Sequence, residues 1–277
     1  MKTLYTYIIE SRNQNTSALN DWDGHIHLFN HKNPIPKNYG FAKCVGFMDL
    51  EYDDIDNINV LDSYTDYIKN HWDKEKEILL ATGITFDDIK SVYEKYPDII
   101  KGFGELKCYD SYINTKVPYK KIGFVKNVVH YSNEHGNLPV YIHWEFNSTV
   151  DVIKLEGIIK AYPNVPIVLC HLGMNEDNMN IAFVEAVRLQ KQYNNVWLDI
   201  SWSASNYLLD NPMRLNNLDL SRVILGTDLN NKLFGVNHNK KERERGLEIF
   251  LKLKEYLHID NSNNIRRLFF NLEEEPK

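Results

Sequence analysis

The sequence predicts an α/β protein folded as a single (β/α)8 TIM barrel, with parallel strands inside and helices outside. Three observations predict this fold: eight short apolar segments, amphipathic segments between them, and a length of 277 residues, close to the roughly 250 that such a barrel needs. We find no linker, low-complexity tract or change of composition along the chain. Residues 1–277 are therefore expected to form one domain.

Eight apolar segments bounded by polar residues, proline or glycine are the predicted strands. They are residues 23–29, 43–49, 77–86, 99–109, 138–144, 165–173, 196–202 and 222–230. Most are apolar almost throughout, as expected where both faces of a parallel strand are buried.

Segments with helical periodicity lie between the predicted strands. Residues 119–135, 150–162 and 242–257 each place apolar side chains on one face; in the second, Val152 and Leu155 belong to that face. Strands that alternate with helices indicate a parallel sheet. The other parallel architecture, an open doubly wound sheet, would call for a glycine-rich phosphate loop after the first strand. The first strand ends instead in His-Ile-His-Leu-Phe, which favours the barrel.

Composition narrows the classes of function. The net charge is −6 and no lysine-rich stripe occurs, which argues modestly against nucleic acid, although a local basic patch could still admit a strand end. No run reaches the roughly 18 apolar residues of a membrane span, and the first apolar stretch ends too early for a signal peptide. Three scattered cysteines without a CxxC pair indicate reduced thiols. We therefore expect a cytoplasmic protein with no membrane partner.

Polar residues with metal-binding chemistry fall late in the predicted strands, where a barrel places its functional side chains. They are His25 and His27 in the first strand, Glu105 and Lys107 in the fourth, His143 in the fifth, His171 in the sixth and Asp228 in the eighth. A spacing of two residues points both members of the first two pairs to one face of their strand.

Imidazole and carboxylate groups are the ligands that zinc and similar metals take at catalytic sites, where the metal lowers the pKa of a bound water to about 7. Each residue alone has a structural explanation: Asp228 could cap a turn, and Glu105 could pair with Lys107. The joint pattern, with four of the ten histidines at strand ends, favours a metal site.

Further residues could surround this site. His31 and His238 follow the first and eighth strands and could line the mouth of a pocket. Phe29, Trp144 and Trp202 follow strands one, five and seven, where they either contact a compact organic substrate or pack under the loops. The sequence is compatible with both substrate contact and packing under the loops.

Taken together, these motifs resemble the amidohydrolase superfamily of metal-dependent hydrolases. The resemblance consists of DGHIH, GELK, YIHWE, LCHLG and LGTD, in the superfamily's order, within residues 23–230. The closing IRRLFFN is similar to the C-terminal helix of its smaller members. The combination is specific, although no single motif is.

The resemblance implies one or two divalent ions, with zinc expected. The implied ligands are His25, His27 and Asp228 for one ion and His143 and His171 for a second. Glu105 would bridge them, as in the TatD-like branch, and Lys107 would bind substrate; the alternative is a carboxylated Lys107 as the bridge. The TatD-like pattern continues toward Gly-Leu-Asp, whereas this chain has Lys107-Cys108-Tyr109. Asp228 would act as general base and then as general acid.

The expected function is hydrolysis of a small ester, lactone, amide or phosphoester. Within the same resemblance, the alternatives are a TatD-like deoxyribonuclease and a non-oxidative decarboxylase. A barrel that has lost catalysis is a third alternative, which the presence of Asp228 and of the His25–His27 pair disfavours. The expected partners are a small-molecule substrate and, as in relatives, a second copy of the chain.

Overall fold

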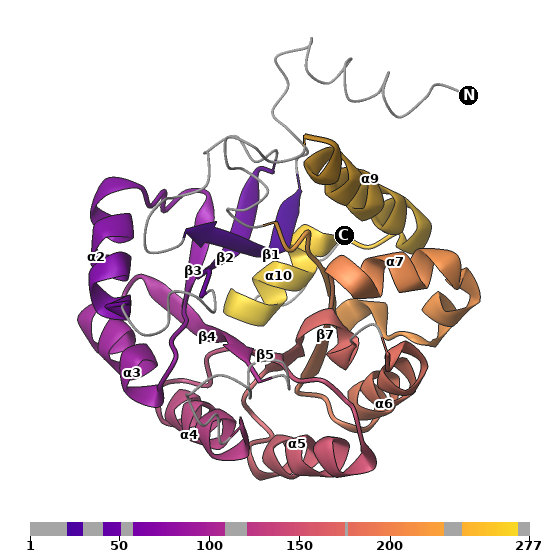
Figure 1. Ribbon diagram of the computed structural model, residues 1–277, viewed down its shortest axis with the longest axis horizontal. Coiled ribbons are helices and arrows are strands. Elements are labelled where there is room, and N and C mark those ends of the chain that lie inside the picture. Colours follow the sequence, from indigo (N-terminus) through magenta and orange to yellow (C-terminus); the bar gives the residue numbers. More distant parts are fainter. Residues whose placement is uncertain are drawn as a thin grey trace.

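The computed structural model describes residues 21–29, 41–50, 58–108, 121–174, 177–229 and 240–270. Within them, eight parallel strands are hydrogen-bonded in chain order, and helices surround the sheet (Figure 1). The strands are β1 (Trp22–Phe29), β2 (Lys43–Met48), β3 (Glu77–Ala81), β4 (Ile100–Lys107), β5 (Val140–His143), β6 (Ile167–Leu169), β7 (Val196–Ile200) and β8 (Val223–Leu225). The predicted TIM barrel is confirmed.

The helices form the outer layer of the barrel. They are α2 (Val60–Asn70), α3 (Phe86–Lys95), α4 (Lys121–Glu134), α5 (Thr149–Ala161), α6 (Met179–Gln192), α7 (Trp202–Asp210), α9 (Lys240–Leu257) and α10 (Asn261–Phe270), with short 3-10 helices η3 (Cys170–Gly173), η4 (Pro212–Asn217) and η5 (Leu220–Arg222). Local sequence explains several starts: Thr85 and Asp88 form a capping box on α3, and the Ser148 side chain caps α5. Among the residues that the structure describes, no helix has the length and apolar character for crossing a membrane.

Most predicted strands are longer than the observed ones, and three differ most at their ends. β3 ends at Ala81, β6 ends at Leu169, and β8 ends at Leu225. After β6 the chain turns through η3, where His171 and Leu172 have positive φ angles of 52° and 57°. The apolar pattern continues past these strand ends because the following residues are also buried. The apolar pattern therefore predicted the positions of the strands, but it did not predict where the extended backbone ends.

The barrel closes along the seam between β1 and β8. Asp228 N donates to His25 O at 2.8 Å, and His27 N donates to Leu229 O at 2.8 Å. Two glycines allow this approach: a Cβ on Gly226 would lie 2.8 Å from His25 N, and one on Gly24 would lie 2.9 Å from Leu225 O. Both distances are too short for a side chain, so the glycines of DGHIH and LGTD permit the closure.

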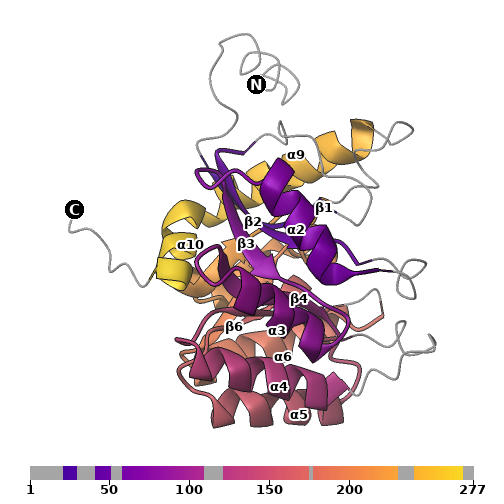
Figure 2. The same cartoon turned by 90° about the vertical axis from the view of Figure 1, so that its left-hand side faces the viewer.

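The apolar core has two parts. The larger part lies between the strands and the outer helices, and the smaller part fills the inside of the barrel with side chains that include Phe47, Tyr141, Val168 and Ile224. Ile265 and Leu268 of α10 belong to the inner part. In Figure 1, α10 lies over the centre of the ring of helices, and Figure 2 shows it from the side, at the left of the barrel. It contacts β1 and β8. α10 therefore covers one end of the barrel and leaves the other for a site.

Candidate metal centre

The first two histidines come from β1. His25 and His27 lie two residues apart on an extended strand, so both rings point into the barrel, and they are 0% and 4% exposed. Asp23, fully buried on the same strand, accepts from His25 N at 3.1 Å and from Thr227 N at 3.0 Å. These bonds hold the β1 histidines against the chain that follows β8.

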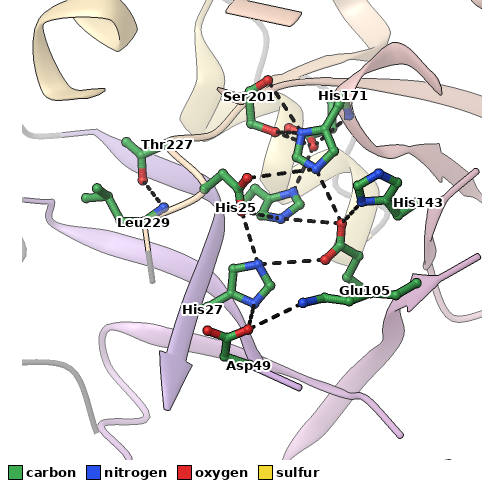
Figure 3. A network of polar contacts seen from close by, with 12 residues as sticks. His25, His27, Asp49, Glu105, His143, His171, Ser201, Thr227 and Leu229 are labelled. Atoms are coloured by element: carbon green, nitrogen blue, oxygen red, sulfur yellow. Dashed lines mark hydrogen bonds and ion pairs between the residues drawn. The ribbon is translucent and has the colours of Figure 1, made fainter. Parts of the chain in front are cut away.

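Glu105 of β4 lies in the middle of the cluster (Figure 3). Its Oε1 is 2.9 Å from His143 Nδ1, 3.3 Å from His171 Nε2 and 4.0 Å from His25 Nε2. Its Oε2 is 3.7 Å from His27 Nε2. One buried carboxylate thus contacts histidines from three different strand ends.

His171 reaches the cluster from η3 rather than from a strand. Its backbone is in the left-handed region, and its backbone N lies 3.4 Å from a buried oxygen, Asp199 Oδ2. Left-handed residues other than glycine are costly and persist where the surroundings hold them. The turn directs the His171 ring toward Glu105 and next to the His143 ring, whose centroid is 4.7 Å away.

Asp228 completes the cluster from a position three residues beyond β8. Its φ is 57°, a conformation that aspartate tolerates better than most residues. Its Oδ1 is 3.0 Å from His27 Nε2 and 3.3 Å from His25 Nε2, and its Oδ2 is 3.9 Å from His171 Nε2. The backbone bond from Asp228 N to His25 O fixes this placement.

The histidines keep both acidic groups ionised. Burial favours a neutral Glu105, but contacts with His143 and His171 outweigh it and hold the pKa of Glu105 well below its usual range. The same balance, with His25 as the main partner, lowers the pKa of Asp228. Burial lowers the pKa of His143, which favours its neutral form. The cluster therefore offers two carboxylates and the uncharged His143 imidazole to a cation. Burial opposes the charged forms of His25 and His171, but Asp199 and Asp228 beside His25, and Glu105 and Asp228 beside His171, raise the pKa of both rings, so a bound cation would displace a proton from each.

Lys107 lies beside the cluster. Its Nζ is 3.3 Å from Asp49 Oδ1 and 3.3 Å from Leu50 O, and its side chain is 14% exposed. Asp49 Oδ1 is also 3.8 Å from His27 Nδ1. Lys107 and His27 therefore share one carboxylate from the end of β2.

The sequence analysis assigned no role to Asp49, Asp199 or Ser201. Asp49 closes the second predicted strand, and Asp199 and Ser201 lie two residues apart at the end of the seventh. The spacing rule that singled out His25 and His27 also applies to Asp199 and Ser201. A buried acid within an otherwise apolar strand was the signal that could have found them.

The residues fit a divalent cation. Four groups of described residues have ligand atoms within 4.8 Å of one another: His25, His27 and Glu105; Glu105, His143 and His171; His25, His171 and Asp228; His25, Cys170 and Asp199. His25 Nε2 and His27 Nδ1 are buried with no hydrogen-bond partner in the part of the chain that the structure describes. Buried polar atoms are normally satisfied, so such nitrogens are suited to metal ligation. Glu105 belongs to two of the groups, which suits a bridging carboxylate.

The structure describes only some of the residues that the sequence placed around the site. Phe29 and Trp144 are each 2% exposed, and the Phe29 ring stacks on Tyr67 at 4.1 Å between centroids. These contacts are core packing under the loops. His31, His238 and the Trp202 side chain lie outside the described residues.

Comparisons with known proteins agree with this picture. The family model described as amidohydrolase matches residues 129–255, which include His143, His171 and Asp228. No curated protein matches the chain in sequence. A TatD family hydrolase from Entamoeba histolytica superposes with a TM-score of 0.58 at 13% identity, covering 93% of this chain and 100% of that one.

Two further solved structures share the fold. Dihydroorotase from Saccharomyces cerevisiae, in complex with 5-fluoroorotic acid, has a TM-score of 0.58 at 13% identity over 92% of this chain and 84% of that one. A probable 2-pyrone-4,6-dicarboxylic acid hydrolase from Acinetobacter baumannii, with citric acid bound, has a TM-score of 0.54 at 17% identity over 91% of this chain and 99% of that one. The family match over residues 129–255 agrees with the resemblance carried by the strand-end motifs, and the solved structures show that the barrel fold is shared.

Proposed function

We propose that the enzyme is a metal-dependent hydrolase that cleaves a small ester, lactone, amide or phosphoester. The observation that carries this proposal is the position of Glu105, whose carboxylate contacts all four histidines within 4.0 Å. Imidazoles gathered around a buried carboxylate form the donor set that zinc and similar cations take at catalytic sites.

In this proposal the residues divide between two divalent ions, with zinc the expected metal. His25, His27 and Asp228 would hold one ion, His143 and His171 would hold the other, and Glu105 would contribute to both. Such ions lower the pKa of a coordinated water to about 7 and polarise the bond to be broken.

The chain's own residues supply the proton transfers. Asp228 is ionised, because its contacts with His25 and His27 outweigh its burial and lower its pKa. Its side chain is 16% exposed, against 2% for Glu105, so it lies at the open side of the cluster. There Asp228 accepts the proton from the attacking water and returns it to the leaving group. Lys107, at 14% exposure, is placed to bind the substrate.

Metal analysis of the purified protein tests the first step. We expect one or two divalent ions per chain, and we expect His25→Ala to lose most of them. His130→Ala is the matched control, since His130 lies on α4 with a 55% exposed side chain. A wild-type protein that binds no divalent ion under any condition would refute the proposal, as would a His25→Ala variant with unchanged metal content.

A substrate panel tests the second step. It contains nitrophenyl esters, lactones, acylated amines and phosphoesters, assayed with Zn, Mn and Mg. Two further assays cover the other activities: digestion of single-stranded DNA for a TatD-like nuclease, and carbon dioxide release from aromatic or pyrone acids for a decarboxylase. Hydrolysis of a panel member that His25→Ala abolishes is the expected result. If the panel members are not hydrolysed and only DNA digestion or only carbon dioxide release is detected, that activity replaces the proposed reaction.

A further inference from the structure

β7 supplies none of the proposed metal ligands, yet its end carries two fully buried polar side chains, Asp199 and Ser201. They lie two residues apart and point to the same side of the chain. Ser201 also occupies the N-cap position of α7, but its hydroxyl makes no capping bond. A serine at that position normally stabilises the helix by about 1 kcal/mol through its cap. Here the hydroxyl is directed elsewhere.

Both side chains bond to histidines of the cluster, and Figure 3 shows the Ser201 side chain next to the His171 ring. Asp199 Oδ2 is 2.8 Å from His25 Nδ1 and accepts from Ser201 Oγ at 2.7 Å. Ser201 Oγ is in turn 2.9 Å from His171 Nδ1. The result is a continuous chain of hydrogen bonds from the His25 ring to the His171 ring.

Counting protons fixes the direction of every bond in this chain. Asp199 Oδ2 accepts from Ser201 Oγ and also lies next to His25 Nδ1, so His25 Nδ1 carries the proton of that bond and donates it. The single proton of the Ser201 hydroxyl is directed to Asp199, so Ser201 Oγ must accept from His171 Nδ1–H. The Ser201 carbonyl, 3.4 Å from His171 Nδ1, can also only accept. Both rings therefore keep their proton on Nδ1.

We propose that Asp199 and Ser201 are a positioning pair that holds His25 and His171 in the same tautomer and orientation, ready to bind metal through Nε2. This inference rests on the proposed metal centre. In both rings, Nε2 is the atom that faces Asp228 and Glu105. Metal-bound histidines commonly donate their other ring proton to a carboxylate. In this enzyme one carboxylate serves two histidines, one directly and one through a hydroxyl.

The arrangement makes an unequal prediction for the two residues. Asp199→Asn changes the acceptor for the His25 ring and for the Ser201 hydroxyl that holds His171, whereas Ser201→Ala removes only the bond to His171. We expect zinc affinity, measured by competition with a chromophoric chelator, to fall about 100-fold for Asp199→Asn and about 10-fold for Ser201→Ala. Ser201→Thr keeps the hydroxyl and should restore most of the affinity.

Matched controls separate this role from general damage. Ser132→Ala removes another fully buried serine hydroxyl, which donates to Leu138 O far from the cluster. Glu77→Gln neutralises another buried carboxylate, which accepts from the Tyr67 hydroxyl. Both should leave zinc affinity unchanged, even if they lower the unfolding temperature.

Nitrogen NMR of the zinc-loaded protein gives a readout that a purely structural role would not change. The wild type should show His25 and His171 protonated on Nδ1, and Ser201→Ala should lose the slow exchange of the His171 proton alone. If Ser201→Ala keeps that proton and wild-type affinity, the inference is wrong although the metal centre stands. If the wild type binds no zinc at all, the proposed function itself has failed.

Discussion

The two ends of the barrel differ in how their buried polar groups are satisfied. At the end that α10 covers, Asn261 uses its whole amide: Nδ2 donates to Trp22 O and Leu225 O, and Oδ1 accepts from Leu225 N. At the other end, His25 Nε2 and His27 Nδ1 are buried with no hydrogen-bond partner in the described chain. The same β1–β8 seam is thus closed by a saturated neutral amide at one end and by an unsaturated, charged cluster at the other.

This difference indicates that one end of the barrel contributes mainly to stability and the other end to chemistry. A buried amide with every bond made stabilises the fold, whereas buried ring nitrogens without a hydrogen bond cost free energy and persist where they bind something. In barrel enzymes the carboxyl ends of the strands carry the active site and the opposite end carries stability. Variants at the two ends should therefore change different measurable quantities.

The largest effect is expected for Glu105→Gln. The change keeps the size of the side chain but removes the charge that all four histidines contact. Metal content should fall, and kcat/KM should drop at least about 10³-fold, corresponding to the roughly 4 kcal/mol or more that a metal centre contributes to catalysis. Metal analysis and steady-state kinetics measure both. A variant that keeps its metal and its activity would remove Glu105 from the proposed bridge.

Asn261→Ala should lower the stability of the fold and leave metal binding unchanged. Losing this fully buried amide leaves three backbone groups of β1 and β8 without their bonds, so we expect a loss of about 2–3 kcal/mol of unfolding free energy. Urea unfolding of the metal-free protein measures the loss, and zinc affinity should not change. Asn263→Ala, on the same helix, is the control and should stay within about 0.5 kcal/mol. A large fall in zinc affinity with Asn261→Ala would show that the two ends are not independent.

Lys107→Ala tests the alternative bridge. Because Lys107 Nζ already bonds to Asp49 and Leu50, we expect this variant to keep its metal and to lose about tenfold in kcat/KM through a higher KM. Comparing the metal content of Lys107→Ala with that of Glu105→Gln distinguishes the two candidate bridging ligands. If Lys107→Ala loses as much metal as Glu105→Gln, a carboxylated lysine is the bridge and Glu105 is a supporting residue.

Residues within the strands could be predicted from the sequence better than residues beyond the strand ends. The eight strands were recognisable because parallel strands buried on both faces are apolar almost throughout, and His25, His27, Glu105 and His143 lie within them at the spacing expected. The placement of His171 and Asp228 was not predictable in detail. Each lies beyond its strand in a left-handed conformation that tertiary contacts impose.

Asp199 shows a different limit. A buried acid in an apolar strand signals a partner, but the partner, His25, lies 174 residues earlier in the chain. Only the closure of the barrel, with β8 between them, brings β7 near β1. Sequence spacing identifies groups on one strand, and pairing across strands needs the fold.

The smallest expected effect lies at neither end, on the outer helices. Glu156 of α5 binds Arg188 of α6 at 3.0 Å, and that hydrogen bond, with the Tyr193 hydroxyl, lowers the pKa of Glu156 to about 2. A depressed carboxyl pKa stabilises the fold above the unfolded value, about 4.3, and this contribution disappears as the pH falls from there toward about 2.

Glu156→Gln should therefore cost at most about 1 kcal/mol at pH 7, and the gap to wild type should narrow steadily below about pH 4.3. Urea unfolding at several pH values follows the gap, and Glu75→Gln, with a 78% exposed side chain, should show none. Because Glu156 is remote from both ends of the barrel, zinc affinity should be the same in all three proteins. A gap that stays constant down to pH 2.5 would mean that Glu156 stabilises α5 and α6 by packing rather than by its charge.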